Sequence, residues 1–218
     1  MNWLELLPEL LDGWGMTLRL LAVAMPLGLL LGALIGTVRV YGPWPLRAAA
    51  GLYQSVLRGV PLVVQLFVLY YALPRTGLLL TPFAAAILGF GMCSGAYHSE
   101  YIRSAISSIP RGQMEAARAV GMSRGQAVRA IILPQALRRA VPGCGNELVY
   151  LVKYSSLAYL VTLVDLMGAG RIEANASFRF FETFLVVGTI YLVMVSILRA
   201  ALHVLQRAWR RSSVGLGA

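Results

Sequence analysis

Three ionisable residues, Glu147, Lys153 and Asp165, lie in one apolar stretch of the chain. Charged side chains are costly in hydrocarbon, so an acid or a base within an apolar segment is by default a candidate for function. Successive positions in a helix turn by about 100°. In one continuous helix Glu147 and Asp165 therefore share a face, whereas Lys153 points in another direction. We predict that Glu147 binds a cationic group of a ligand.

A structural role for Glu147 is the alternative. Its carboxylate could pair with Lys153 or with an arginine of a neighbouring chain, and such a pair would only hold helices together. The residue types alone leave both interpretations open.

Other polar side chains in apolar segments could hydrogen-bond the ammonium and carboxylate of a zwitterion, and each could equally join helices. The predicted substrate-binding set contains, besides Glu147, the residues Gln65, Ser94, Tyr97, Tyr150, Tyr154 and Ser155. Neither His98 nor His203 has a second ligand at metal-binding spacing, so we predict no metal site. The chain shows no His-Glu-x-x-His motif and no carboxylate cluster, which argues against an intramembrane enzyme.

The elements that position these residues are predicted to be membrane helices. Of the 218 residues 58% are hydrophobic and only 13% are charged, a composition typical of membrane proteins and not of soluble domains. The net charge of +10 comes from arginines beside apolar runs, which favours a membrane surface over nucleic acid as the partner. We predict an all-α membrane protein with one transmembrane domain over residues 1–218.

Apolar runs near the roughly 20 residues that a helical span requires occur five times. The predicted spans are residues 17–38, 54–73, 81–97, 141–163 and 184–205. Basic residues flank them unequally, 14 on one side against 4 on the other. The positive-inside rule then places the N-terminus outside and the C-terminus in the cytoplasm. In the third span, Gly89, Gly91 and Gly95 predict close helix packing.

A polar interval, residues 103–140, falls on the cytoplasmic side. Pro110 precedes a helical pattern that ends near Gly121, a residue suited to a C-terminal turn. Ser123 and Gln126 then form a capping-box pattern for a second helix, which we expect Pro134 to stop. Periodicity alone fits either a helix–turn–helix element that a partner contacts or an amphipathic loop lying along the bilayer.

This interval resembles the EAA loop of importer-type ABC transporter permeases. The matching residues are Glu115-Ala116-Ala117, Gly121 and Ile131-x-Leu133-Pro134. Flanking stretches, Leu57–Leu66 and Ala96–Gln113, are similar to motifs of the polar amino-acid branch of that family. The resemblance covers nearly the whole chain.

The resemblance implies a multi-pass permease of a bacterial inner membrane, itself not an enzyme, whose N-terminus lies in the periplasm. Its loop would be a coupling helix that docks on a cytoplasmic ATPase dimer through Glu115, Ala116, Ala117, Arg118, Gly121 and Arg124. The chain lacks a phosphate-binding loop, so ATP and magnesium would bind to that partner, and this chain would need no cofactor. A periplasmic amino-acid-binding protein and a second permease, a related chain rather than an identical one, complete the expected assembly.

The segment around Glu147 is most similar to permeases for basic amino acids, namely histidine, arginine, lysine and ornithine. Tyr154 and His98 depart from the residues common in that group. Glutamate, glutamine and cystine remain alternative substrates. An ATP-independent secondary transporter or channel is the alternative function, but such folds usually have internal inverted repeats and more spans.

Overall fold

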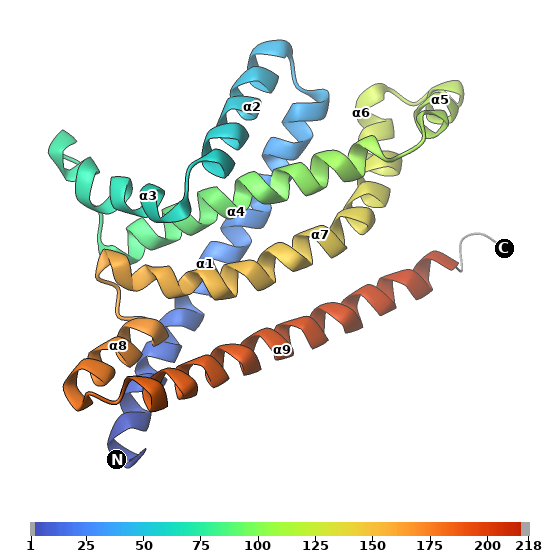
Figure 1. Ribbon diagram of the computed structural model, residues 1–218. Coiled ribbons are helices and arrows are strands. Elements are labelled where there is room, and N and C mark those ends of the chain that lie inside the picture. The colour runs from blue at the N-terminus through green and yellow to red at the C-terminus, as the bar shows by residue number, and fades with distance from the viewer. Residues whose placement is uncertain (1–2, 215–218) are drawn as a thin grey trace.

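The computed structural model describes residues 3–214, and side chains are described for residues 8–207. Every regular element in these residues is helical, as Figure 1 shows. The α-helices are α1 (Trp3–Tyr41), α2 (Trp44–Gly59), α3 (Leu62–Phe67), α4 (Pro82–Ser107), α5 (Arg111–Ala119), α6 (Arg124–Ala127), α7 (Leu133–Tyr154), α8 (Leu166–Ser177) and α9 (Phe180–Val214). The predicted all-α fold is confirmed.

Two helices are long and apolar enough to cross a membrane, Pro8–Tyr41 of α1 and Phe180–Arg207 of α9. Two bent pairs reach the same standard if each pair counts as one span, which gives up to four. The third predicted span, residues 81–97, corresponds to α4, whose 26 residues rise about 39 Å at 1.5 Å each. Helix α4 does not meet the apolarity requirement, and it carries buried Ser94, His98 and Ser99 at its centre.

The second predicted span, residues 54–73, is not one straight helix. Its two parts, Trp44–Gly59 and Leu62–Thr76, meet at 104°. Val60 is extended (φ −92°, ψ 131°), the conformation that a following proline favours, and Pro61 begins the new direction. The Gln65 side-chain amide donates to the carbonyls of Leu57 and Val60, each at 2.8 Å, and so satisfies backbone groups freed by the bend.

The fourth predicted span also differs from the structure. Pro134 does not stop the preceding helix, because it occupies the first turn of α7, directly after a π-helical turn over Val128–Ile132. A proline in the first turn of a helix costs little, since its missing N–H would have no partner there. At the other end, a 3₁₀ segment (Ser155–Val161) follows α7, and Thr162 adopts a left-handed conformation (φ 63°). The expectation that Glu147 and Asp165 share one helix face is therefore wrong.

Helices α1 and α4 pack closely along their length, and glycines spaced four apart on α1 lie in this contact. A Cβ atom placed on Gly28 would lie 2.9 Å from Ser94 Oγ, and one on Gly36 would lie 2.8 Å from the Ser99 carbonyl oxygen. From the α4 side, a Cβ on Gly91 would meet Leu27 Cδ2 at 2.5 Å, which confirms the predicted close packing there. Small residues let helix backbones approach, and dispersion forces then hold them together.

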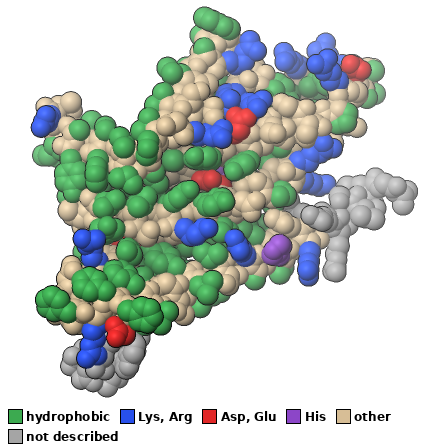
Figure 2. Space-filling model, viewed as in Figure 1, with side chains coloured by type: hydrophobic (Ala, Val, Ile, Leu, Met, Phe, Trp, Pro, Cys, Tyr) green, Lys and Arg blue, Asp and Glu red, His purple; other side chains and the backbone are tan. Residues whose placement is uncertain are grey.

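The elements divide between two ends of the molecule. Figure 1 shows α5, α6 and the last turns of α9 on one side, with α8 and the start of α1 on the other. In Figure 2 the Lys and Arg side chains gather near the α1–α2 turn, over α5 and α6, and along α9. This distribution agrees with the orientation expected from the positive-inside rule.

Candidate functional site

Glu147 lies on α7 with only 4% of its surface exposed. Ser94 of α4 is only 1% exposed. Its hydroxyl lies close enough to the Glu147 carboxyl to influence the ionisation of that group. Ser94 Oγ is also 3.1 Å from His98 Nδ1 and is thereby held in place on α4. An acid and a hydroxyl from two helices thus face each other inside an apolar bundle.

Aromatic side chains surround this pair. Tyr150 and Tyr154, half exposed, stack with ring centroids 6.1 Å apart, and Tyr154 lies near both Glu147 and Tyr97. The Tyr97 ring is covered by the Arg58 guanidinium at 4.9 Å. The structure therefore brings five of the seven predicted substrate-binding residues into one neighbourhood, namely Glu147, Ser94, Tyr97, Tyr150 and Tyr154.

No cationic side chain among residues 8–207 forms an ion pair with Glu147; every ion pair in that range involves Glu100. Lys153 instead points outward and lies over the Tyr150 ring, with Nζ 4.8 Å from the centroid. The expectation that Lys153 and Glu147 point in different directions is confirmed, and a structural pair between these two residues is absent. An arginine of a neighbouring chain remains the structural alternative.

The side-chain donors of Gln65 and Ser155 are engaged by the backbone, whereas Gln65 Oε1 is buried without a hydrogen-bond partner among the described residues. Gln65 donates to the two carbonyls at the α2–α3 bend, and Ser155 Oγ donates to the Val152 carbonyl at 2.7 Å. Both side chains are buried, so their donors serve the backbone. Their substrate role stays a prediction.

Asp165, the other acid of this region, is a helix cap. Its Oδ1 accepts a hydrogen bond from Gly168 N at 2.9 Å at the start of α8, and its Oδ2 accepts one from the Tyr191 hydroxyl at 3.3 Å. The Leu166 N–H beside it donates to Thr17 Oγ1 at 3.0 Å. Asp165 is fully buried, and these bonds tie α1, α8 and α9 together.

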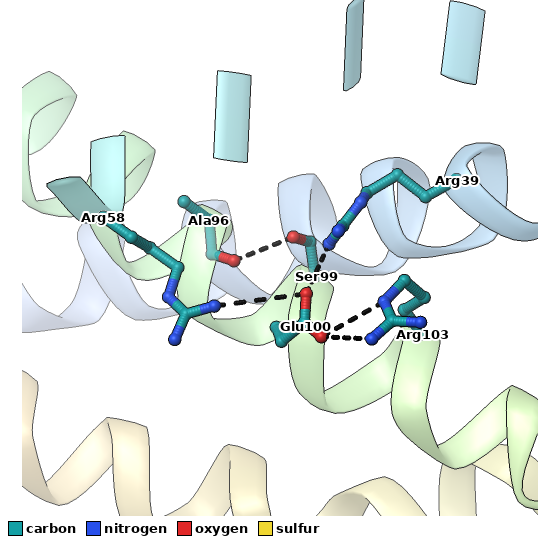
Figure 3. Close-up of polar contacts among 6 residues, drawn as sticks. All are labelled: Arg39, Arg58, Ala96, Ser99, Glu100 and Arg103. Atoms are coloured by element: carbon teal, nitrogen blue, oxygen red, sulfur yellow. Dashed lines mark hydrogen bonds and ion pairs between the residues drawn. The ribbon is translucent and has the colours of Figure 1, made fainter. Parts of the chain in front are cut away.

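Glu100 is a functional candidate that the sequence reasoning did not single out. Figure 3 shows its carboxylate between arginines of three helices: Arg39 of α1, Arg58 of α2 and Arg103 of α4. Oε2 lies 2.6 Å from Arg39 and 4.0 Å from Arg58, while Oε1 accepts from Arg103 Nε at 3.1 Å. Only the Glu-x-x-Arg spacing of Glu100 and Arg103 is visible in the sequence, because the other two partners arrive from distant helices.

This ion-pair cluster lies beyond the predicted end of the third span, at Tyr97. The hydrogen bond from Arg103, with further help from Arg39, lowers the pKa of Glu100 from 4.5 to about 2. The carboxylate therefore stays charged, and its pairs join α1, α2 and α4 at the end that carries the basic residues.

The predicted coupling loop is a compact helix–turn–helix. Helix α5 ends in a motif in which Gly121 is left-handed (φ 86°), Gly121 N–H donates to the Arg118 carbonyl and Met122 N–H donates to the Ala117 carbonyl, each at 3.1 Å. The capping box of Ser123 and Gln126 is confirmed, with both hydrogen bonds formed. The loop is thus built as a rigid element.

Among the predicted coupling residues, exposure separates two groups. Ala117 is buried at 5% and packs inside the loop. The others are exposed: Glu115, Ala116, Arg118, Gly121 and Arg124. The Arg124 guanidinium lies over the Tyr41 ring at 5.8 Å, which fastens the loop to the end of α1. Val120, 79% exposed at the tip, is an apolar residue that the sequence reasoning left out.

This bundle, with its rigid helical loop, agrees with a family comparison. Residues 24–211 match the family model described as the binding-protein-dependent transport system inner membrane component. The chain belongs to this family. As a permease of this kind it is a non-catalytic, multi-pass transport subunit of a bacterial inner membrane, and it works with an ATPase and a binding protein.

Several curated relatives cover most of this permease. The probable amino-acid ABC transporter permease protein PatM of Vibrio harveyi is 42% identical, over 89% of each chain. The glutamine transport system permease protein GlnP of Escherichia coli (36%; 92% of this chain, 93% of GlnP) and the arginine transport system permease protein ArtQ of Bacillus subtilis (36%; 88% of each) are similar at greater distance.

A solved structure, described as an amino acid ABC transporter with histidines, superposes on this permease with a TM-score of 0.88. It is 32% identical to this permease, and the match covers 95% of this chain and 97% of that one. Together these matches make the chain the permease subunit of a binding-protein-dependent amino-acid ABC importer.

Proposed function

We propose that this permease carries basic amino acids and that Glu147 binds their cationic side chain. The observation that carries the proposal is a buried carboxylate that forms no ion pair with any described side chain. A buried charge is stable only if it is paired or hydrogen-bonded, or else it becomes neutral. A guanidinium or ammonium group of the substrate supplies the missing partner during transport.

The surrounding side chains suit the same ligand. Tyr97, Tyr150 and Tyr154 offer ring faces, which attract cations at short range. Lys153 already uses Tyr150 in this way, and Arg58 uses Tyr97. Ser94 adds a hydroxyl that can accept from an ammonium group. Support also comes from the arginine permease relative, whereas the glutamine permease relative, equally identical, supports a neutral substrate instead.

A transport assay with the complete importer decides between a basic and a neutral amino acid as the substrate. The permease, its ATPase and its binding protein are reconstituted in proteoliposomes, and ATP hydrolysis is measured with arginine, lysine, histidine or glutamine. We expect basic amino acids to stimulate hydrolysis, and we expect Glu147→Gln to reduce that stimulation at least about tenfold, as loss of a buried charge pair does. Glu182→Gln, an exposed acid at the start of α9, is the matched control and should behave as wild type.

Two outcomes would overturn the proposal. One is stimulation by glutamine alone in the wild-type importer. The other is unchanged stimulation by arginine in the Glu147→Gln variant, which would leave Glu147 without a substrate role. Co-purification of the subunits shows in each case that the variant complex is intact.

We also propose that the exposed face of α5 and its tip dock on the ATPase, and that the second permease is a related chain. The first part rests on exposed small residues at a rigid loop, with Ala116 and Val120 accessible. The proposal of a related second permease rests on Glu147. In a pair of unequal chains, an acid of this type in one chain would suffice for one substrate site. Both parts are tested by co-purification.

The docking variant is Ala116→Asp, and its control is Gly112→Asp at the opposite end of α5, where a Cβ atom would meet nothing within 4 Å. We expect the first variant to lose the ATPase and the control to retain it. Gly121 is a poorer choice, because its positive φ strains any side chain placed there. Recovery of only one kind of permease chain from the purified complex would refute the unequal pair.

A further inference from the structure

A polar hollow lies between α7 and α9, apart from the Glu147 neighbourhood. Its volume is about 230 Å³. Three residues of α7 line it, Gly145, Asn146 and Val149, and four residues of α9 complete it, Arg199, Leu202, His203 and Gln206. Neither the family nor the proposed function assigns a ligand to this place.

The glycine in α7 determines the depth of the hollow. A Cβ atom on Gly145 would lie 3.3 Å from both δ-carbons of Leu202 and 3.7 Å from the Gln206 side-chain nitrogen. The floor of the hollow is therefore apolar and tight. The rim is polar, since Asn146, Arg199, His203 and Gln206 carry nitrogen donors around it.

The charge around the hollow is of one sign. Among the described side chains, no acidic residue lines it. Arg199 and His203 are exposed, and no ion pair or hydrogen bond engages either side chain within residues 8–207. Two further basic residues extend this row. Lys153 lies one turn beyond Val149 on α7, and Arg207 lies one turn beyond His203 on α9. Figure 2 shows this row as Lys and Arg side chains with one histidine along α7 and α9.

The position of the hollow on a membrane helix favours the anionic headgroup of a lipid as its ligand. Helix α9 meets the requirements for a membrane span over Phe180–Arg207, and the hollow occupies the last turns of that stretch. Beside it, Ile197 and Val204 expose 65% and 69% of their surface, an apolar flank suited to acyl chains. Basic pockets between membrane helices on the cytoplasmic side are suited to anionic headgroups.

We infer that this hollow binds the phosphate of an anionic phospholipid, with the acyl chains lying along the exposed flank of α9. Arg199 presents a planar set of donors that matches phosphate oxygens, and His203 approaches from the next turn. Asn146 and Gln206 donate to the remaining headgroup oxygens. The lipid thereby joins α7, which carries Glu147, to α9. This inference is independent of which amino acid the importer carries.

The test uses the complete importer in detergent–lipid micelles that contain photoreactive phosphatidylglycerol or photoreactive phosphatidylcholine with the same acyl chains. After illumination, labelled peptides of α7 and α9 are quantified by mass spectrometry. We expect phosphatidylglycerol to label them several-fold more than phosphatidylcholine. An arginine near a membrane surface contributes about a fivefold preference, so Arg199→Gln with His203→Gln, which also removes the imidazole donor, should bring the two lipids close to parity.

Controls separate this site from general surface charge. Arg47→Gln removes one exposed basic residue of α2, on the same side of the membrane but away from the hollow, and should leave the preference unchanged. Arg199→Gln alone changes only an exposed side chain, and it should cause about a fivefold loss even if the double variant fails to assemble. A thermal unfolding curve reports the integrity of each variant.

Three results would overturn the inference. Equal labelling by both lipids in the wild type would show no preference for an anionic headgroup. A preference of undiminished size in Arg199→Gln would place the lipid elsewhere. Complete suppression of labelling by low-millimolar inorganic phosphate would show that the hollow holds a free anion and not a lipid.

Discussion

Glu147 and Asp165 lie 18 positions apart in one apolar stretch, and both are buried, yet their surroundings differ. Asp165 uses both carboxylate oxygens within its own chain, on the Gly168 N–H and the Tyr191 hydroxyl. Glu147 forms no ion pair within residues 8–207, and the groups that act on its carboxyl are the Ser94 hydroxyl and Arg58, which lies beyond ion-pair distance. Burial alone therefore does not distinguish a structural acid from a binding acid.

The two acids offset the cost of burying a carboxylate in different ways. For Asp165 the cost is offset on folding, because its bonds begin α8 and connect it to α9. For Glu147 the compensating group is not part of the fold, so the site can pair with a ligand that comes and goes. The predictions that follow compare the effects of these acids and their supports on the free energy of unfolding.

Asp165→Ala should have the largest effect. It removes the cap of α8 and leaves the Tyr191 hydroxyl buried without its acceptor, so we expect a loss of about 2–4 kcal/mol. Denaturant unfolding of the purified importer measures it. Asp165→Asn, which keeps an acceptor for the Gly168 N–H, should lose less than half as much. Equal losses for both variants would show that the charge matters more than the cap.

Gly32→Ala tests the support of the Glu147 neighbourhood. A Cβ atom on Gly32 would overlap the His98 Cβ atom, and His98 holds Ser94 through Nδ1. We expect α1 and α4 to separate at a cost of about 1–3 kcal/mol, together with weaker stimulation by substrate. Gly51→Ala in α2, where a Cβ atom would meet nothing within 4 Å, is the control. A stable, fully active Gly32→Ala variant would mean that the α1–α4 contact adapts easily.

Glu100→Gln should have a smaller effect, roughly 1 kcal/mol, because its pairs with arginines are partly exposed. The pKa of Glu100 is lowered in the folded state from 4.5 to about 2 by Arg103 and Arg39, so the charged form stabilises the fold above about pH 5. This contribution declines as the pH falls below the ordinary pKa and is lost near pH 2. Thermal unfolding from pH 7 to pH 3 should show wild type and variant converging, and a constant difference would contradict the assignment.

Glu147→Gln should have the smallest effect on stability, within about 0.5 kcal/mol, because no ion pair within the described side chains depends on its charge. The same variant should lose substrate stimulation. Unfolding and ATP hydrolysis are measured on one preparation. A loss of several kcal/mol would make Glu147 a structural acid like Asp165 and would remove the contrast between them.

Much of this architecture can be predicted from local sequence patterns. The all-α fold follows from apolar runs, the basic end from the distribution of arginines, and the loop from Pro110, Gly121 and the capping box of Ser123 and Gln126. The two acids are likewise visible as charges in an apolar stretch. Each of these signals depends on residues within a few positions of one another, where sequence distance and spatial distance agree.

Contacts between segments that are distant in the sequence could not be predicted from local patterns and are visible only in the tertiary structure. The 3₁₀ segment after Tyr154 and the left-handed Thr162 turn the chain, so Asp165 begins a new helix and meets Tyr191 of α9. Glu100 meets Arg39 across 61 positions, which no local spacing encodes.

The residue types available to this permease, and the elements on which they lie, can thus be predicted from local patterns. Only the tertiary structure decided which acid is satisfied by its own fold and which is left for a ligand. The physical reason is that a carboxylate's role depends on the donors within about 3 Å of its oxygens, and here those donors come from helices far apart in the chain.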